Sequence, residues 1–296
     1  MNPSVESPVP KRGWRPLRRL APVRLVVFFV ILVVAYVGAR LALGWALHHT
    51  PMRTADWVAL GGAMALAAAL IGIYAALVHG MERRQATEVS PRARQALAGI
   101  VSGFVGFVAV LGLMRAGGWA QLRGLSAGFD VVPALAGASL AAVGEELAVR
   151  GAVFRILEES CGTLVALVLS AALFGLLHAL NPGASLISTA AVAIEAGVLL
   201  GAAYALTANL WLPIGLHFGW NFTEGGIFGA AVSGGAAGKG VFVVTFTGPR
   251  LLTGGEFGPE ASVIAVAVSF AAALLLIALT VRAGRWKPIT WRMTLA

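Results

Sequence analysis

Long apolar segments alternate with short polar ones along most of the chain. A helix that crosses a membrane needs about 20 mainly apolar residues. The sequence has eight segments near that length, of which the fifth is borderline and the seventh short, at 25–47, 56–79, 96–117, 131–156, 163–180, 185–207, 210–223 and 261–281. The pattern predicts an all-α polytopic membrane protein with about eight transmembrane helices.

Composition supports this interpretation, because 58% of the 296 residues are hydrophobic and only 12% are charged. A soluble domain of this length carries about twice that share of charge. The single cysteine, Cys161, excludes an internal disulfide framework and a cysteine-rich metal site.

The net charge of +9 follows the predicted topology. An even number of passes puts both termini on one side, and cations concentrate in cytoplasmic segments. We therefore place both termini and the 80–95 loop in the cytoplasm and the chain in the cell inner (plasma) membrane. Nucleic acid is not expected as a partner, since no basic folded domain remains. The clustered cations are Lys11, Arg12, Arg15, Arg18, Arg19, Arg24, Arg83, Arg84, Arg92, Arg94, Arg282, Arg285, Lys287 and Arg292.

Few ionisable side chains lie well inside the apolar segments. Among the glutamates and histidines they are Glu145, Glu146, Glu195, His178 and His217. A charged group at the centre of a membrane helix costs about 2.5–3.5 kcal/mol on insertion scales. Each such residue therefore needs a partner or a cavity, and we take function as the first hypothesis.

The stretch "GEELAVR" carries two adjacent carboxylates and an arginine. Glu146 and Arg150 are four residues apart, so they share a helix face and can form an ion pair. Glu145 points about 100° away from that face. We interpret Glu146–Arg150 as a structural pair and Glu145 as facing a cavity; the alternative is one buried network that holds helices together.

His178, in "FGLLH", is matched to Glu145 by spacing. If Cys161 and Gly162 form the turn of a helical hairpin, the two side chains lie sixteen residues from it on either side and come level. The hairpin must then sit toward the cytoplasm, so the fifth segment ends inside the protein at Asn181–Pro182. Such an end is tolerated only where the freed backbone lines a cavity.

The stretch "PIGLHFGWN" places His217 and Asn221 four residues apart on one helix face, after Pro213 in a first helical turn. Both side chains can donate hydrogen bonds into a common pocket. The alternative is a polar pair that packs two membrane helices.

Together, "EELAVR", "FGLLH" and "HFGWN" resemble the motifs of the CAAX protease and bacteriocin-processing family, also called the Abi family, of intramembrane endopeptidases. The Ras-converting CAAX prenyl protease of eukaryotes belongs with this family. The resemblance covers about residues 131–224 and falls on Glu145, Glu146 and Arg150, on Phe174 and His178, and on His217 and Asn221.

The resemblance implies eight helices around a polar intramembrane cavity and assigns roles to four residues. Glu145 and His178 would activate a water molecule, while His217 and Asn221 would bind the oxyanion. Peptide hydrolysis needs such a base and such donors. The leaving amine would take its proton from His178 or from the newly protonated Glu145.

A metal-free mechanism is favoured, with no cofactor. Two histidines and a glutamate are also a possible zinc set, but the His-Glu-x-x-His motif is absent and Asn221 is an unusual zinc ligand. Zinc is kept as the alternative.

Two other classes of function compete with an endopeptidase. One is a catalytically silent scaffold that sequesters membrane partners. The other is a proton-relaying transporter, which the absence of paired half-repeats argues against. The complete set of four pocket residues favours the endopeptidase, with a membrane-anchored peptide or protein as substrate in the lipid bilayer. The sequence names neither that substrate nor an oligomeric state.

The sequence predicts five regions. They are a disordered basic cytoplasmic tail (1–23), N-terminal transmembrane helices (24–130), the catalytic core (131–224), a glycine-rich extracytoplasmic loop (225–260), and the last transmembrane helix with a basic tail (261–296).

Overall fold

The computed structural model describes residues 20–291 of a mostly helical protein. Within these residues, six helices are long and apolar enough to cross a membrane: Ala21–His48, Thr54–Glu82, Ala93–Ala116, Val131–Cys161, Leu186–Thr207 and Val263–Arg282. The two other predicted segments fall on shorter helices, α6 (Thr163–His178) and α9 (Trp211–Asn221). The protein is therefore a multi-pass membrane protein with six long apolar helices and two shorter ones.

Several helices continue into π-helical segments, and two short 3₁₀ helices lie in connecting loops; both kinds are labelled η. In chain order, the elements are α1 (Ala21–His48), α2 (Met52–Leu77), η2 (Val78–Glu82), η3 (Thr87–Val89), α3 (Ala93–Ala116), β1 (Ala120–Leu125), α4 (Val131–Glu146), η4 (Leu147–Phe154), α5 (Arg155–Cys161), α6 (Thr163–His178), α7 (Leu186–Val192), η5 (Ala193–Val198), α8 (Leu199–Thr207), α9 (Trp211–Asn221), η6 (Phe222–Ile227), β2 (Phe242–Phe246), α10 (Arg250–Thr253), η7 (Pro259–Ala261) and α11 (Val263–Arg282).

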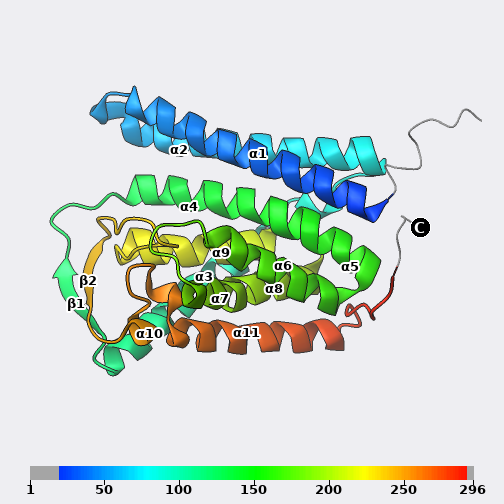
Figure 1. Ribbon diagram of the computed structural model, residues 1–296. Coiled ribbons are helices and arrows are strands. Elements are labelled where there is room, and N and C mark those ends of the chain that lie inside the picture. The colour runs from blue at the N-terminus through cyan, green and yellow to red at the C-terminus, as the bar shows by residue number, and fades with distance from the viewer. Residues whose placement is uncertain (1–19, 292–296) are drawn as a thin grey trace, which may run out of the picture.

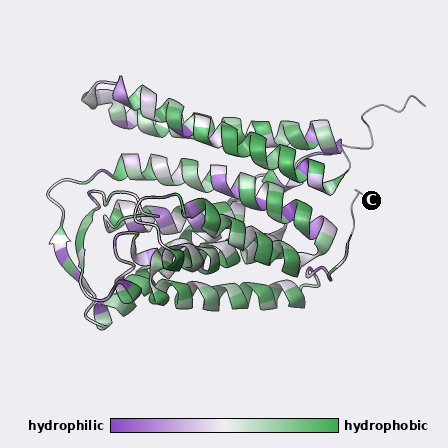
Figure 2. Cartoon of the chain, in the orientation of Figure 1, coloured by the Kyte–Doolittle hydropathy of each residue, from purple (hydrophilic) through white to green (hydrophobic). Residues whose placement is uncertain are grey.

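The helices form a bundle in which α1 and α2 cover one side of the α4 helix, and α11 lies on the opposite side of the molecule (Figure 1). The start of α1 and the end of α11 lie at the same end of this bundle, whereas β1 and β2 lie at the other. Figure 2 shows hydrophobic residues along most of α11 and hydrophilic ones in β1 and the connecting loops. The compartment at each end stays a prediction.

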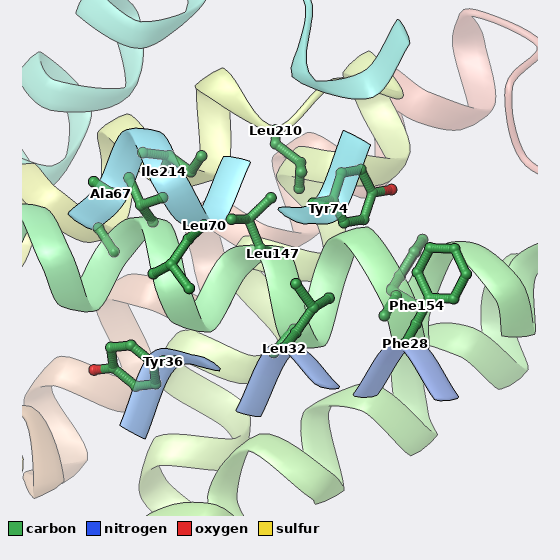
Figure 3. Close-up of a cluster of buried hydrophobic side chains, with 14 of the residues drawn as sticks. Phe28, Leu32, Tyr36, Ala67, Leu70, Tyr74, Leu147, Phe154, Leu210 and Ile214 are labelled. Atoms are coloured by element: carbon green, nitrogen blue, oxygen red, sulfur yellow. The ribbon is translucent and has the colours of Figure 1, made fainter. Parts of the chain in front are cut away.

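A hydrophobic cluster fixes α1 and α2 against the α4 helix (Figure 3). Phe28 and Leu32 from α1, Tyr74 from α2 and Leu147 from η4 are at most 1% exposed. The N-terminal helices, which carry no motif, are therefore packed on the motif-bearing helix.

Glycines set the distance between α3 and α9. A Cβ atom at Gly99 or Gly103 would overlap the backbone of α9, and one at Gly215 or Gly219 would overlap the backbone of α3. These pairs, each four residues apart, let the two helix backbones touch. Because α9 carries His217, this close contact helps to place that histidine.

The prediction of an all-α protein overlooked a two-stranded sheet. β1 and β2 pair antiparallel, with Ala120 opposite Phe246 and Leu125 opposite Phe242. β2 lies within the predicted glycine-rich loop 225–260, which also contains the short helix α10. β1 is nearly all exposed and lacks a long alternating pattern, so little in its residues indicates a strand.

The predicted tail 1–23 lies almost wholly outside the described residues, and α1 begins at Ala21. Residues 292–296 of the predicted C-terminal tail are also outside them.

Candidate active site

The helical hairpin formed by α4–η4–α5 and α6 brings Glu145 and His178 together, as their spacing predicts. The turn lies at Gly162, whose φ of 88° is in the left-handed region that favours glycine. His178 Nε2 lies 3.9 Å from Glu145 Oε2. The hairpin thus places a carboxylate and an imidazole side by side.

α9 adds His217 from the other side of Glu145. His217 Nε2 lies 3.9 Å from the same Glu145 Oε2 atom. This oxygen is buried and has no hydrogen-bond partner among residues 20–291. Two imidazole nitrogens and one carboxylate oxygen therefore converge on a single point.

The predicted ion pair between Glu146 and Arg150 is present and fully buried. Arg150 Nη1 donates to Glu146 Oε1 at 2.8 Å, and Arg150 Nη2 donates to the backbone carbonyls of Ala196 and Gly197 at 3.0 and 3.1 Å. Glu146 Oε1 also lies 3.1 Å from His217 Nδ1. The pair is therefore connected to the site through His217, which the sequence interpretation did not foresee.

Phe174, the aromatic residue of the second motif, lies next to the arginine and both histidines. The Arg150 guanidinium lies 4.5 Å from the centre of its ring. The rings of His178 and His217 lie 4.6 Å and 6.1 Å from it, centre to centre. One aromatic ring thus packs against both histidines and the arginine, and restricts how each can rotate.

An acceptor next to each histidine indicates which ring nitrogen carries the hydrogen. His178 Nδ1 lies 2.8 Å from the Phe174 carbonyl, which can only accept, so Nδ1 carries a hydrogen. His217 Nδ1 faces the Glu146 carboxylate, and when that group is ionised Nδ1 donates to it. In both neutral rings, Nε2 is then a hydrogen-bond acceptor.

A cavity of about 510 Å³ leads to this site. Its walls include Glu145, His178 and Asn221, the α1 residues Tyr36 and Arg40, and small side chains of α4. Asn181 and Pro182, which follow the end of α6, also line it. The fifth predicted segment therefore ends beside a cavity, although Leu180 and Pro182 at its end are exposed and not inside the protein as predicted.

A second cavity of about 20 Å³ lies against the two histidines and Asn221. That volume holds about one water molecule. Glu195, which the sequence placed inside an apolar segment, lines it together with Glu260 and Ser233. Asn221, His178 and Ser233 border both cavities.

The three convergent atoms belong to histidine and glutamate side chains, which are residue types that bind zinc in other proteins. Two ligands held at about 2.0–2.1 Å in a tetrahedral zinc site lie roughly 3.3 Å apart. The two histidine nitrogens are each 3.9 Å from the Glu145 oxygen, so they would have to approach it by about 0.6 Å. The donor types fit zinc, and the spacing is wider than zinc requires.

Sequence reasoning also missed a contact between α1 and Glu145. The Tyr36 hydroxyl of α1 donates a hydrogen bond to Glu145 Oε1 at 3.0 Å. A tyrosine in an apolar helix is a weak signal, and nothing in the local sequence indicates a contact between residues 109 positions apart.

Comparison with known families supports the resemblance that the three motifs indicated. Residues 127–223, about a third of the chain, match the family described as Rce1-like: Type II CAAX prenyl endopeptidase Rce1-like. The matched range includes Glu145, His178, His217 and Asn221. Comparisons with curated proteins and with solved structures give no match.

Proposed function

We propose that the protein is an intramembrane endopeptidase that hydrolyses a peptide bond of a membrane-associated peptide or protein. The observation that carries this proposal is the convergence of His178 Nε2 and His217 Nε2 on the buried, unpartnered Glu145 Oε2. The match of residues 127–223 to a CAAX prenyl endopeptidase family supports it. A hydrolase of lipid-embedded substrates needs such a polar site inside an apolar bundle.

In the proposed reaction, Glu145 Oε2 takes a proton from a water molecule, and the water oxygen attacks the scissile carbonyl carbon. His178 Nε2 accepts a hydrogen bond from the same water and orients it. The carbonyl oxygen becomes an oxyanion that hydrogen-bond donors must stabilise. When the tetrahedral intermediate collapses, the carbon–nitrogen bond breaks and the amine needs a proton.

The hydrogen bonds of the histidines favour one of the two candidate sources of that proton. A neutral His178 has its only N–H directed at the Phe174 carbonyl, so it has none to give to the amine. We therefore assign the proton transfer to the newly protonated Glu145. The carboxylate is regenerated, and both product termini leave through the large cavity.

His217 can donate to the oxyanion only as an imidazolium, because its Nδ1 already faces Glu146. The carboxylate oxygens nearest to this ring are Glu146 Oε1, 3.1 Å from Nδ1, and Glu145 Oε2, 3.9 Å from Nε2. Asn221, one helical turn later, adds an amide donor that needs no change of charge. The Glu146–Arg150 pair thus has a positioning role toward His217 beside its structural one.

The proposal is tested by changing Glu145 to glutamine and comparing membrane proteomes. Cells with the wild-type protein should accumulate cleaved products of one or a few membrane proteins, and cells with Glu145→Gln should not. Glu256→Gln, at a glutamate whose side chain is 79% exposed, is the matched control and should behave as wild type. Cleavage by purified, folded Glu145→Gln would contradict the assignment of the base.

Zinc is the second candidate mechanism, because the three convergent atoms are zinc donors. In that case Glu145, His178 and His217 would hold the metal, which would supply an activated water and polarise the carbonyl. Elemental analysis of the purified protein, with turnover measured after chelation and after metal return, separates the two mechanisms. About one zinc per chain whose removal stops turnover would refute the metal-free mechanism; full turnover without zinc would refute the metal-dependent one.

A further inference from the structure

The α1 helix lies outside residues 127–223 and yet reaches the proposed base. Tyr36 is 9% exposed, and its hydroxyl is the hydrogen-bond donor to Glu145 Oε1 at 3.0 Å. Among residues 20–291, no other side chain donates to this carboxylate, and its second oxygen has no hydrogen-bond partner. The two oxygens of Glu145 are therefore in different environments.

This difference fixes the rotation of the carboxylate. With Oε1 held by the Tyr36 hydroxyl, Oε2 is directed toward His178 Nε2 and His217 Nε2, each 3.9 Å away. Without the tyrosine hydroxyl, the carboxylate could turn about its Cγ–Cδ bond, and neither oxygen would keep its place. A base must lie within hydrogen-bond reach of the proton that it removes.

Packing holds the tyrosine where this contact requires it. Its ring lies so close to Gly144 that a Cβ atom at that glycine would overlap the ring. In Figure 3, Tyr36 extends the α1 row of Phe28 and Leu32, with its hydroxyl at the end of the ring away from Leu32. On the cavity side, the Arg40 guanidinium lies 5.8 Å from the ring centre. The ring is thus confined between α4 and Arg40.

We propose that Tyr36 is a positioning residue of the active site, which orients Glu145 through its hydroxyl. This inference rests on the proposed function and extends it to a helix without a family motif. It assigns α1 a part in catalysis in addition to its packing. The groups that face Glu145 are Tyr36 from α1, His178 from α6 and His217 from α9, and Glu146 and Arg150 are the nearest charges on its own helix.

The test is Tyr36→Phe, which removes only the hydroxyl and keeps the ring that packs on Gly144. The loss of a hydrogen bond to a charged group changes an equilibrium constant or a rate by about 10- to 100-fold. We expect kcat on a substrate identified by the proteome comparison to fall by about that factor, with KM within about threefold of wild type. The pH–rate profile of Tyr36→Phe should differ from that of wild type, because the Glu145 carboxylate loses the donor that fixes its orientation.

Tyr74→Phe is the matched control. The Tyr74 hydroxyl also donates to a carboxylate, that of Glu88, but at the end of the bundle that holds the start of α1. Its loss should lower the melting temperature and leave the pH–rate profile unchanged. An unchanged kcat and profile in Tyr36→Phe would overturn the proposal, and a change in KM alone would make Tyr36 a substrate contact instead.

A substrate-free measurement separates this inference from the proposed function. Infrared difference spectra of the reconstituted protein, with Glu145→Gln as the blank, follow the carbonyl band of the protonated Glu145 side chain. In Tyr36→Phe we expect this band at a shifted frequency, because the carboxyl group no longer has the tyrosine hydroxyl as a hydrogen-bond partner. An identical band in both proteins would refute the contact, whether or not a peptidase activity is found. A shifted band in a protein without peptidase activity would retain the contact and refute the proposed function alone.

Discussion

Asn221 is the one proposed oxyanion donor whose hydrogen does not depend on protonation. It is half-buried, lies one turn after His217 on α9, and borders both cavities. A donor of this kind acts mainly on the charge that develops in the transition state. Its removal should therefore affect turnover much more than substrate affinity.

We expect Asn221→Ala to lower kcat by about 10²–10³-fold with little change in KM. Steady-state kinetics on a purified substrate measures both. Asn209→Ala is a suitable control, because Asn209 donates to the Ser90 carbonyl outside both cavities and should affect stability instead. A raised KM at normal kcat would place Asn221 in substrate binding.

At this scale, the sequence predicted the residues better than their contacts. Glu145, His178 and His217 were identifiable because ionisable residues are rare in the apolar segments. The Glu146–Arg150 pair was predictable because it lies within one helix turn. The contacts of Tyr36 with Glu145 and of Glu146 with His217 were not, since each depends on how separate helices pack.

Among the elements, η4 and η5 are linked through one side chain. Arg150 lies in η4, and it donates to the carbonyls of Ala196 and Gly197 in η5. A π-helical segment has a distorted hydrogen-bond ladder, so its carbonyls are available to outside donors. The buried guanidinium stabilises that distortion, holds Glu146, and packs on Phe174.

Replacing Arg150 with alanine should destabilise the protein, because Glu146 would stay buried without its partner. Breaking a buried ion pair costs about 3–5 kcal/mol. Thermal melting in detergent should show a clear loss, while Arg123→Ala, at an exposed position of β1, should melt as wild type. A normal melt with lost turnover would instead make the effect of Arg150 on His217 the main one.

The longer an apolar element is, the more readily the sequence predicts it. The six long apolar helices follow directly from hydropathy. β1 and β2 were overlooked because each is five or six residues long and their pairing joins segments far apart in the chain. The end of α6 beside the large cavity was predicted only because the spacing of Glu145 and His178 required the two side chains to come level.

Across the whole molecule, ion pairs join α1, the loop after α2, and α5 at the end opposite to the β-sheet. Arg84 donates to both oxygens of Glu88 at 2.8 Å, and Arg155 Nε lies 3.4 Å from Glu88 Oε1. Burial disfavours the ionised form of Glu88. The hydrogen bonds from Arg84 and Tyr74 and the charge of Arg155 outweigh this effect, so the pKa of Glu88 lies below its usual value.

This lowered pKa predicts how stability depends on pH. A carboxyl group whose pKa is lower in the folded state stabilises that state above its unfolded pKa of about 4.3 and loses the contribution as pH falls through the folded value. The melting temperature should therefore decrease as the pH is lowered below about 5.

The Glu88→Gln variant should have a lower melting temperature than wild type at neutral pH and a weaker decrease of that temperature at acid pH. The exposed pair Arg250–Glu256 offers the comparison, and Glu256→Gln should leave the melting curve unchanged at every pH. An unaltered acid slope in Glu88→Gln would contradict the prediction.

The short α6 helix also determines how the bilayer meets this protein. Its 16 residues rise about 24 Å, whereas the hydrocarbon core is about 30 Å thick. Leu176, Leu180 and Leu186, at and after its end, are exposed on the outer surface. Such a mismatch is accommodated by local thinning of the bilayer. We therefore expect the lipid headgroups next to α6 to lie closer to the level of His178 than they do around the six long apolar helices. Membrane thickness, which varies with lipid chain length and sterol content, should then act on the hydration of this site.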